Sequence, residues 1–213
     1  TVRDGEVTEW DGRLIPTTEN VTKDGNVSEV IESARGEQLS RVAGQTEVEL
    51  DARFSSNYHD ETNFGNLITD AFRWKTGADV AITNAGGIRS DGQYGSGNVT
   101  AGDVFSVLPF NNHLVTVELT GAQIEDVLES QVVTLDSETG QQYGSEAQLQ
   151  VSGVTYEWVG DESTNDQLRS VYVNGDPLDS EATYTVTVNS YMAGWEGSHL
   201  ANATRTDVDY TMY

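Results

Sequence analysis

The chain has 213 residues, enough for one sizeable domain with a short appendage and for a buried core. Acidic residues outnumber basic ones 35 to 11, a formal net charge of −24, and such a surface argues against binding a nucleic-acid polymer because it repels phosphate backbones. The absence of cysteine excludes disulfides and thiolate chemistry, and no apolar run approaches the roughly 20 residues that a membrane-spanning helix needs.

The lead-in, residues 1–26, is rich in Asp, Gly, Thr and Glu and predicts irregular structure, with a strand-like piece at 14–16 and a turn at 24–26. A helix is predicted from Ser28, a candidate N-cap, because apolar residues recur after it at helical spacing and continue roughly to Val42.

The next segment predicts a strand at 48–51 and then the strongest helical pattern in the chain. Thr62 is placed to cap that helix, its apolar residues share one face, and Gly77 stands where a left-handed C-cap is expected. A short buried strand follows at 80–83, and the chain turns sharply out of it at 84–87.

The second half predicts a short helix capped by Thr100, a strand at 113–120 and a helix capped by Thr120 that runs through Ser130. Three further strands are predicted near residues 149–158, 168–174 and 183–189, with a hairpin turn at Asn174-Gly175 between the last two. Helices followed by mostly antiparallel strands indicate an α+β fold with a mixed β-sheet and packed helices.

Two segments are candidates for ligand contact. The loop Asn84-Ala85-Gly86-Gly87-Ile88-Arg89 leaves a strand end, and its glycines would let the backbone approach a ligand that Arg89 could bind through a phosphate or carboxylate. The alternative is a tight turn whose arginine pairs with a nearby acid. Phe110 is either a lid on the core, which the residues alone favour, or an exposed platform for stacking on a flat ligand.

Three motifs in order resemble the C-terminal, substrate-binding domain of the 5'-nucleotidase family, whose pattern is E-[TS]-N-x-G-N-L, then N-G-G-G-I-R, then x-P-F. In this chain they are Glu61-Thr62-Asn63-Phe64-Gly65-Asn66-Leu67, Asn84 to Arg89, and Leu108-Pro109-Phe110. The resemblance covers about residues 45–200. It implies a domain at 45–213, preceded by a lead-in and interdomain linker helix at 1–44.

The resemblance also implies how a nucleotide or nucleoside would bind. Phe110 would stack on one face of the base, and Tyr191, in a segment similar to the family's F-[LM]-A-x-G-G-D-G, would stack on the other. Asn84 and Glu196 would lie near the sugar, with Gly86 and Gly87 in the loop and Arg89 near the sugar or phosphate.

Two residues depart from the family pattern. Asp60 stands where family members usually carry an arginine that helps to hold the substrate, so binding should weaken unless Arg53, Arg73 or a salt cation compensates. Trp195 stands where a glycine is expected. These departures bear on which substrate is bound.

Catalysis is expected to lie outside this chain. Phosphoester hydrolysis in the resembled family uses two divalent metal ions, and none of the Asp, His and Asn motifs that would hold them occurs here, so no cofactor is expected in this chain. The histidines His59, His113 and His199 lack ligand spacing and are expected in loops or on the surface. No Ser lies in a G-x-S-x-G elbow.

We therefore predict the substrate-binding domain of a 5'-nucleotidase-like phosphohydrolase, similar to bifunctional UDP-sugar hydrolase/5'-nucleotidases. A metallophosphoesterase domain with two divalent metals is expected to precede Thr1 and to perform the hydrolysis, so the chain alone should be inactive. A hinge near Gly36 or Gly44 would let this domain carry substrate to the metals. The alternatives are a non-catalytic surface module on the same fold, or the same fold acting on a nucleotide-sugar, cyclic nucleotide or sulfur compound.

Source and location are predicted from composition. Many acids with only two lysines are typical of proteins adapted to high salt, where screening removes the self-repulsion. Asn-x-Ser/Thr sequons permit glycosylation, and with the family resemblance they favour an extracellular or cell-surface protein. The excess of acids favours a halophilic source.

Overall fold

The computed structural model describes residues 2–3, 5–8, 10–12, 22–129, 134–135, 142–143, 149–158, 168–196 and 198–212. The chain divides into two compact units, Thr1–Gln38 and Leu39–Tyr213. Among the residues described, no helix is both long and apolar enough to cross a membrane. The predicted boundary at residues 44 and 45, the linker role and the hinge at Gly36 or Gly44 stay predictions.

The first unit contains the antiparallel pair β1 (Val2–Arg3) and β2 (Glu6–Val7) and all but the last residue of α1 (Gly25–Leu39). The predicted turn at 24–26 and the predicted cap at Ser28 are wrong. The Asp24 carboxylate accepts hydrogen bonds from the backbone N–H groups of Asn26 (2.9 Å) and Val27 (3.1 Å), so the cap lies four residues before Ser28 and the helix begins at Gly25. The strand-like piece at 14–16 lies outside the described residues.

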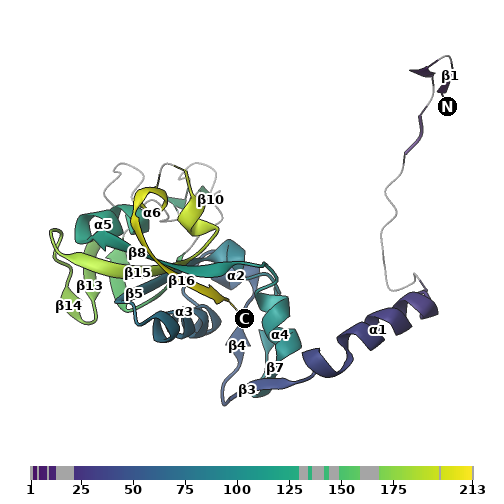
Figure 1. Ribbon diagram of the computed structural model, residues 1–213, viewed down its shortest axis with the longest axis horizontal. Helices are drawn as coiled ribbons and strands as arrows, with labels where there is room; N and C mark the ends of the chain where they lie inside the picture. Colours follow the sequence, from purple (N-terminus) through teal and green to yellow (C-terminus); the bar gives the residue numbers. More distant parts are fainter. Residues whose placement is uncertain are drawn as a thin grey trace. The chain divides into compact units, whose positions relative to one another are not determined.

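The second unit is built on a five-stranded sheet with the strand order β11-β5-β15-β8-β16 (Figure 1). Strands β5 and β15 are parallel and the other neighbours are antiparallel, which confirms the predicted mixed sheet of an α+β fold. The strands are β11 (Leu149–Ser152), β5 (Val80–Asn84), β15 (Thr183–Asn189), β8 (His113–Thr120) and β16 (Thr204–Thr211).

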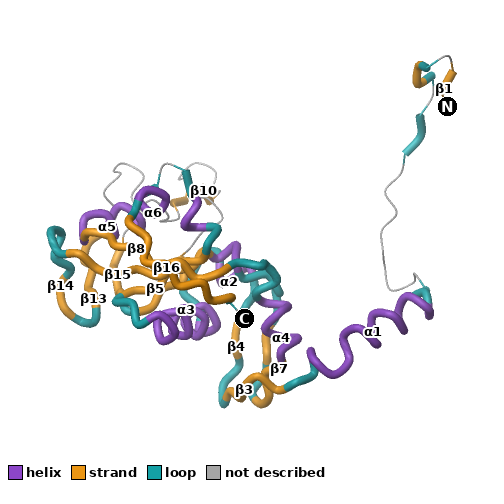
Figure 2. The backbone as a smooth tube through the Cα atoms, in the orientation of Figure 1, coloured by secondary structure: helices purple, strands orange, loops and turns teal. Residues whose placement is uncertain are grey.

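Alternating side chains of these strands face two separate cores. Val80, Val117 and Val186 point into a core that also takes residues from α5 (Gly121–Glu129) and α6 (His199–Asn202). Ala81 and Leu114 point to the other face, where α3 (Asn63–Thr76) contributes apolar side chains. Figure 2 shows α3 lying along one side of the sheet. The central strands β5, β8 and β15 are thus covered on both faces.

Four helix caps predicted from the sequence are confirmed. The Thr62 hydroxyl accepts a hydrogen bond from the Gly65 N–H (3.0 Å), and Gly77 ends α3 with φ 71°. Thr100 forms a capping box with Asp103 at the start of α4 (Ala101–Val107). Thr120 exchanges hydrogen bonds with Gln123 at the start of α5; Ser130, the predicted end of that helix, lies outside the described residues.

Short elements complete the second unit. Three strands form a separate antiparallel sheet, and the rest pair two by two or are single turns of helix. They are β12 (Val154–Trp158), β13 (Leu168–Val173), β14 (Asp176–Pro177), β3 (Val42–Thr46), β7 (Gly97–Thr100), β4 (Leu50–Asp51), β6 (Gln93–Tyr94), β9 (Thr134–Leu135), β10 (Gln142–Tyr143), α2 (Phe54–Asn57), η1 (Ala85–Gly87) and η2 (Met192–Gly194).

Four predictions about element boundaries and connections are corrected. The strand predicted at 48–51 is reduced to β4, and Val42 belongs to β3 rather than to a helical stripe. The Asn174-Gly175 turn connects β13 to β14, because positive φ at both residues closes a tight hairpin at once. Residues 183–189 instead enter the large sheet between β5 and β8. The strand predicted at 149–158 is divided at Gly153, where φ is 77°.

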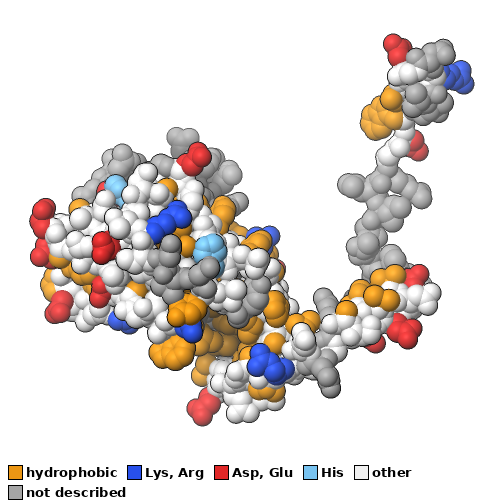
Figure 3. Space-filling model, viewed as in Figure 1, with side chains coloured by type: hydrophobic (Ala, Val, Ile, Leu, Met, Phe, Trp, Pro, Cys, Tyr) orange, Lys and Arg blue, Asp and Glu red, His pale blue; other side chains and the backbone are white. Residues whose placement is uncertain are grey.

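The acidic side chains are spread over the surface of the second unit. Figure 3 shows Asp and Glu dispersed across the visible face, with no single acidic patch. Dispersal keeps like charges apart, which limits their mutual repulsion at a given ionic strength.

Candidate functional site

A pocket of about 300 Å³ lies at one edge of the large sheet. Its lining consists of Asn84, Gly86, Gly87, Arg89, Phe110, Asn112 and Tyr191. Six of the seven candidate residues from the sequence therefore come together. The seventh, Glu196, is exposed and does not line the pocket, and Asn112 is a lining residue that the sequence argument did not single out.

The strand directions explain why residues so far apart in sequence meet here. β5 and β15 run parallel, so their carboxyl ends lie at the same edge of the sheet. Asn84 is the last residue of β5, and Tyr191 comes two residues after the end of β15. β8 is antiparallel to β15, with Leu114 opposite Asn189, so the beginning of β8, just after Phe110 and Asn112, reaches that edge too.

Asn189, which is fully buried, sets the orientation of Asn84. The Asn189 side-chain oxygen accepts a hydrogen bond from the Met192 N–H (2.8 Å), so its amide nitrogen must be the atom that donates to Thr83 Oγ1 and Asn84 Oδ1, both at 3.0 Å. Asn84 must then offer its oxygen to Asn189. Its NH₂ group, a hydrogen-bond donor on a pocket-lining residue, has no partner among the described residues.

Asn112 is held in a similar way. The Ser190 hydroxyl accepts a hydrogen bond from the His113 N–H (3.3 Å) and donates its own hydrogen to Asn112 Oδ1 (3.1 Å). This arrangement satisfies both groups and leaves the Asn112 NH₂ group without a partner among the described residues. Two amide donors therefore line the pocket beside Arg89.

Arg89 is placed between two aromatic rings. Its guanidinium carbon lies 5.6 Å from the centre of the Phe54 ring and 5.9 Å from that of Phe110. Its backbone N–H donates to the Val107 carbonyl (2.9 Å), which fixes the loop. Within the described part of the chain its side chain forms no ion pair or hydrogen bond, so the alternative in which this arginine pairs with a nearby acid is not what the structure shows there.

The two candidate stacking rings are both exposed. Phe110 is 44% and Tyr191 57% accessible, and neither belongs to a core cluster, so the interpretation of Phe110 as a core lid is wrong. Tyr191 is supported by Trp195, whose ring meets it edge-on at 6.0 Å and which packs partly buried against the first core. The tryptophan that departs from the family pattern therefore braces a pocket residue.

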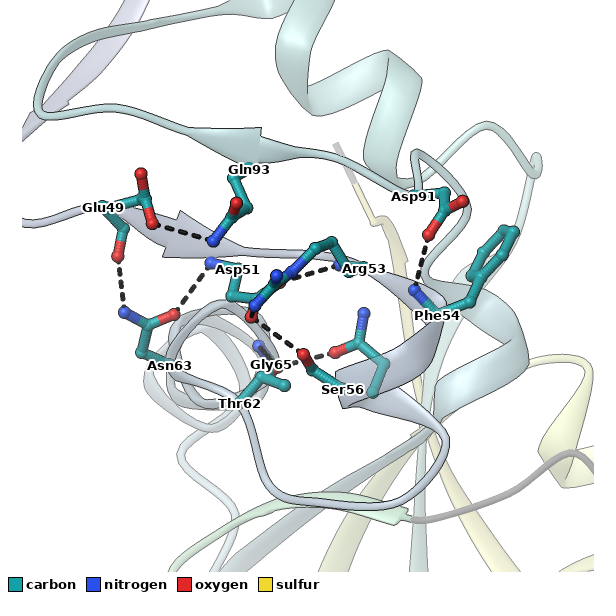
Figure 4. A network of polar contacts seen from close by, with 11 residues as sticks. Glu49, Asp51, Arg53, Phe54, Ser56, Thr62, Asn63, Gly65, Asp91 and Gln93 are labelled. Carbon is teal, nitrogen blue, oxygen red and sulfur yellow. Dashed lines mark hydrogen bonds and ion pairs between the residues drawn. The ribbon is translucent and has the colours of Figure 1, made fainter.

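The Thr62-Asn63-Gly65 segment forms no part of this pocket. Asn63 donates to the Glu49 carbonyl (2.7 Å) and accepts from the Asp51 N–H (2.9 Å), which ties the start of α3 to β4 (Figure 4). The Thr62 hydroxyl donates to Asn57 Oδ1 (2.6 Å) while it caps the helix. These polar groups are used to hold the fold.

The acidic departure, Asp60, lies in a second pocket of about 220 Å³ together with His59, Glu61 and Tyr156. Burial, with a further contribution from Glu61, raises the pKa of Tyr156 to about 12. Asp60 is not among the residues that line the Phe110–Tyr191 pocket.

Both arginines that could compensate for Asp60, Arg53 and Arg73, already bind other groups of the protein. Arg53 forms an ion pair with Asp51 (2.6 Å), and this hydrogen-bonded guanidinium lowers the pKa of Asp51 far below its usual range. Arg73 donates to the Asp79 carbonyl (3.0 Å) and to the Asn174 side chain.

Metal ligands are not grouped in the part of the chain that the structure describes. No three or more His, Asp or Glu side chains lie there in a group that could hold an ion. His59 and His113 are exposed, and His199 lies 2.9 Å from the Asp126 carboxylate. The donor set needed for a divalent metal is therefore not supplied by these residues.

Comparison with known proteins gives consistent similarities. The family model for the 5'-nucleotidase C-terminal domain matches residues 42–203. The chain is 31% identical over 160 residues to Endonuclease YhcR of Bacillus subtilis, covering 75% of this chain and 12% of that protein. It is also 31% identical over 204 residues to the cell wall protein Lmo0130 of Listeria monocytogenes, covering 86% and 25%.

Among solved structures, the 5'-nucleotidase precursor of Thermus thermophilus superimposes with a TM-score of 0.73 at 30% identity. That match covers 88% of this chain and 38% of the Thermus chain. The chain thus spans well under half the length of each of these proteins.

Proposed function

The chain belongs to the family of 5'-nucleotidase C-terminal domains, and from this membership we propose that its pocket binds a nucleotide for hydrolysis. Phe110 and Tyr191 flank the base, Asn84 contacts the sugar, and Arg89 contacts the sugar or the phosphate. Gly86 and Gly87 let the loop approach the ligand. The predicted sugar contact of Glu196 stays a prediction, since that residue does not line the pocket.

One pocket holds two exposed rings and an arginine whose side chain forms no ion pair or hydrogen bond with a described residue, and this combination carries the proposal. Exposed aromatic faces suit a flat base, and stacking on a ring is worth roughly 1–3 kcal/mol without selecting one base. An arginine that forms no ion pair with a described residue, in a chain of net charge −24, is suited to an anionic ligand.

We propose that the hydrolysis itself belongs to an N-terminal metallophosphoesterase domain of a longer protein. Two divalent ions held there would supply the activated water and stabilise the leaving oxygen. This chain would bind and orient the nucleotide. The purified 213-residue chain should then release no phosphate from AMP when Mn²⁺ or Zn²⁺ is added, and turnover would contradict this division of labour.

The substrate range is a further part of the proposal. A nucleoside 5'-phosphate is the first candidate, and a nucleotide-sugar, as in bifunctional UDP-sugar hydrolase/5'-nucleotidases, a cyclic nucleotide or a sulfur compound are alternatives on the same fold. A non-catalytic surface module is the rival from another class. Similarity to a cell wall protein gives that rival some support, and the intact pocket opposes it.

Location and source follow from composition and similarity. We propose an extracellular or cell-surface protein, on the similarity to Lmo0130, and a halophilic source, on the excess of acids. Because salt screens self-repulsion, the melting temperature should rise steeply between low and molar KCl. A melting temperature independent of salt would contradict the halophilic assignment.

The decisive experiment is calorimetric titration of the chain with adenosine and with AMP in molar salt. Phe110→Ala and Tyr191→Ala should each weaken binding by about 1–3 kcal/mol. Trp74→Ala is the matched control, since it removes an aromatic ring that is 83% exposed on α3 and does not line the pocket. Equal binding by all four proteins, or none by the parent, would contradict the proposal.

A further inference from the structure

Phe54 does not line the pocket, yet its ring lies against Arg89. Among the described residues, Arg89 is the one cation that lines the pocket. One way to hold an arginine in place is an ion pair with an acid, as Asp51 holds Arg53. Such a contact would occupy N–H donors and neutralise the charge. A ring face attracts the guanidinium without taking any donor, so the fork stays available to an anion.

The position of Phe54 is fixed by contacts of its backbone and its ring. Its backbone N–H donates to the Asp91 carboxylate (2.8 Å), which links the start of α2 to the loop two residues after Arg89. Its ring meets Tyr58 edge-on, with centroids 5.7 Å apart. Figure 4 shows the Phe54 ring directed away from the Asp51–Arg53 pair, at the side of the network where Asp91 lies.

The residue just before Phe54 is held as well. Asp51 accepts hydrogen bonds from the Arg53 backbone N–H and from its guanidinium, and the Ser56 hydroxyl donates to the same carboxylate (2.9 Å). The turn that presents Phe54 is thus tied at both ends. A ring on a fixed turn can hold a mobile arginine side chain in one place and reduce the entropy lost on binding.

We propose that Phe54 is a positioning residue that, together with Phe110, holds Arg89 as an unneutralised receptor for the charged group of the ligand. This inference rests on the proposed function, because it concerns the same pocket. It goes beyond the proposed function because it assigns a role to Phe54, which does not line the pocket. Its consequence is selectivity for a phosphorylated nucleoside over the free nucleoside.

The test compares AMP with adenosine by calorimetric titration in the parent, Phe54→Leu, Phe54→Tyr and Arg89→Ala. Phe54→Leu keeps an apolar side chain but removes the ring face, so it should weaken AMP binding by about 3- to 10-fold and leave adenosine binding unchanged. Phe54→Tyr should restore AMP binding. Arg89→Ala should abolish the difference between the two ligands.

The outcomes separate the two proposals. If the parent prefers AMP and Phe54→Leu keeps that preference, the positioning role is overturned while the nucleotide pocket stands. If Phe54→Leu weakens both ligands equally and Phe54→Tyr does not rescue AMP, Phe54 is only structural and the inference fails. If the parent binds neither ligand, the proposed function fails and this inference falls with it.

Discussion

Two of the regions that carry the family's motifs use their polar side chains in opposite ways. At the corner formed by Thr62, Asn63 and Asp51, the side-chain groups bond to backbone groups or to neighbouring side chains. At the pocket, Asn84 and Arg89 keep donors that no described residue accepts. Both regions come from motifs of similar strength in the sequence.

The difference shows that residues of two family motifs need not share one structural role. Hydrogen-bond accounting separates the two cases, because a group already paired inside the protein gains little from a ligand, whereas an unpaired donor at a pocket gains a partner. Substitutions at the corner should therefore change stability, and substitutions at the pocket should change affinity.

The largest effect is expected at Gly65. A methyl group added there would lie 2.0 Å from Gln150 Oε1 and 2.5 Å from its Cδ. Gln150 is fully buried and accepts from the Thr62 N–H, so it could move only by losing that bond. Gly65→Ala should destabilise the second unit by about 3 kcal/mol, measured by urea denaturation.

The matched control is Gly95→Ala, because a methyl group at Gly95 meets nothing within 4 Å. AMP affinity measured below the melting temperature should be the same in both variants and in the parent. A loss of affinity in Gly65→Ala without a loss of stability would break the comparison between corner and pocket.

Substitution of Asn189 should change both stability and affinity. Asn189→Ala leaves Thr83, Asn84 and the Met192 N–H without their partner inside the core, at a cost of about 2 kcal/mol. It also frees the Asn84 side chain to rotate, so AMP binding should weaken as well. The exposed Asn98→Ala is the control for both readouts. Unchanged affinity in Asn189→Ala would mean that Asn84 does not need this orientation.

The smallest effect is expected at Asp51, whose pKa is lowered by Arg53. A carboxylate with a lowered folded-state pKa stabilises the fold above its unfolded-state pKa of about 3.9, and this contribution is lost as pH falls toward the folded-state value. The melting temperature of the parent should exceed that of Asp51→Asn at pH 6, and the gap should shrink below about pH 4.

The control for Asp51→Asn is the exposed Asp176→Asn. For an ion pair this accessible the effect should stay under about 1 kcal/mol. A gap that widens on acidification would show that the Asp51–Arg53 pair does not stabilise the corner.

Local sequence signals were sufficient for the elements whose ends are set by nearby residues. Thr62 and Gly77 bound α3, and the Thr100–Asp103 box begins α4, because caps act over only three or four positions. The same reasoning failed at 24–26, where a carboxylate begins a helix that the apolar pattern placed later. It also gives the wrong strand at 174–175, where the turn joins β13 to β14 rather than to residues 183–189.

The sequence by itself determined the family, the mixed α+β fold and six residues of the pocket, because these depend on motifs and on periodicities that are visible along the chain. Only the tertiary structure decided which polar groups are already paired and which keep donors without a partner among the described residues. It placed Asn112 and Asn189 at the site and set Phe54 against Arg89. These relationships join residues from different strands and loops, and the spacing of residues in a linear sequence does not encode such distances.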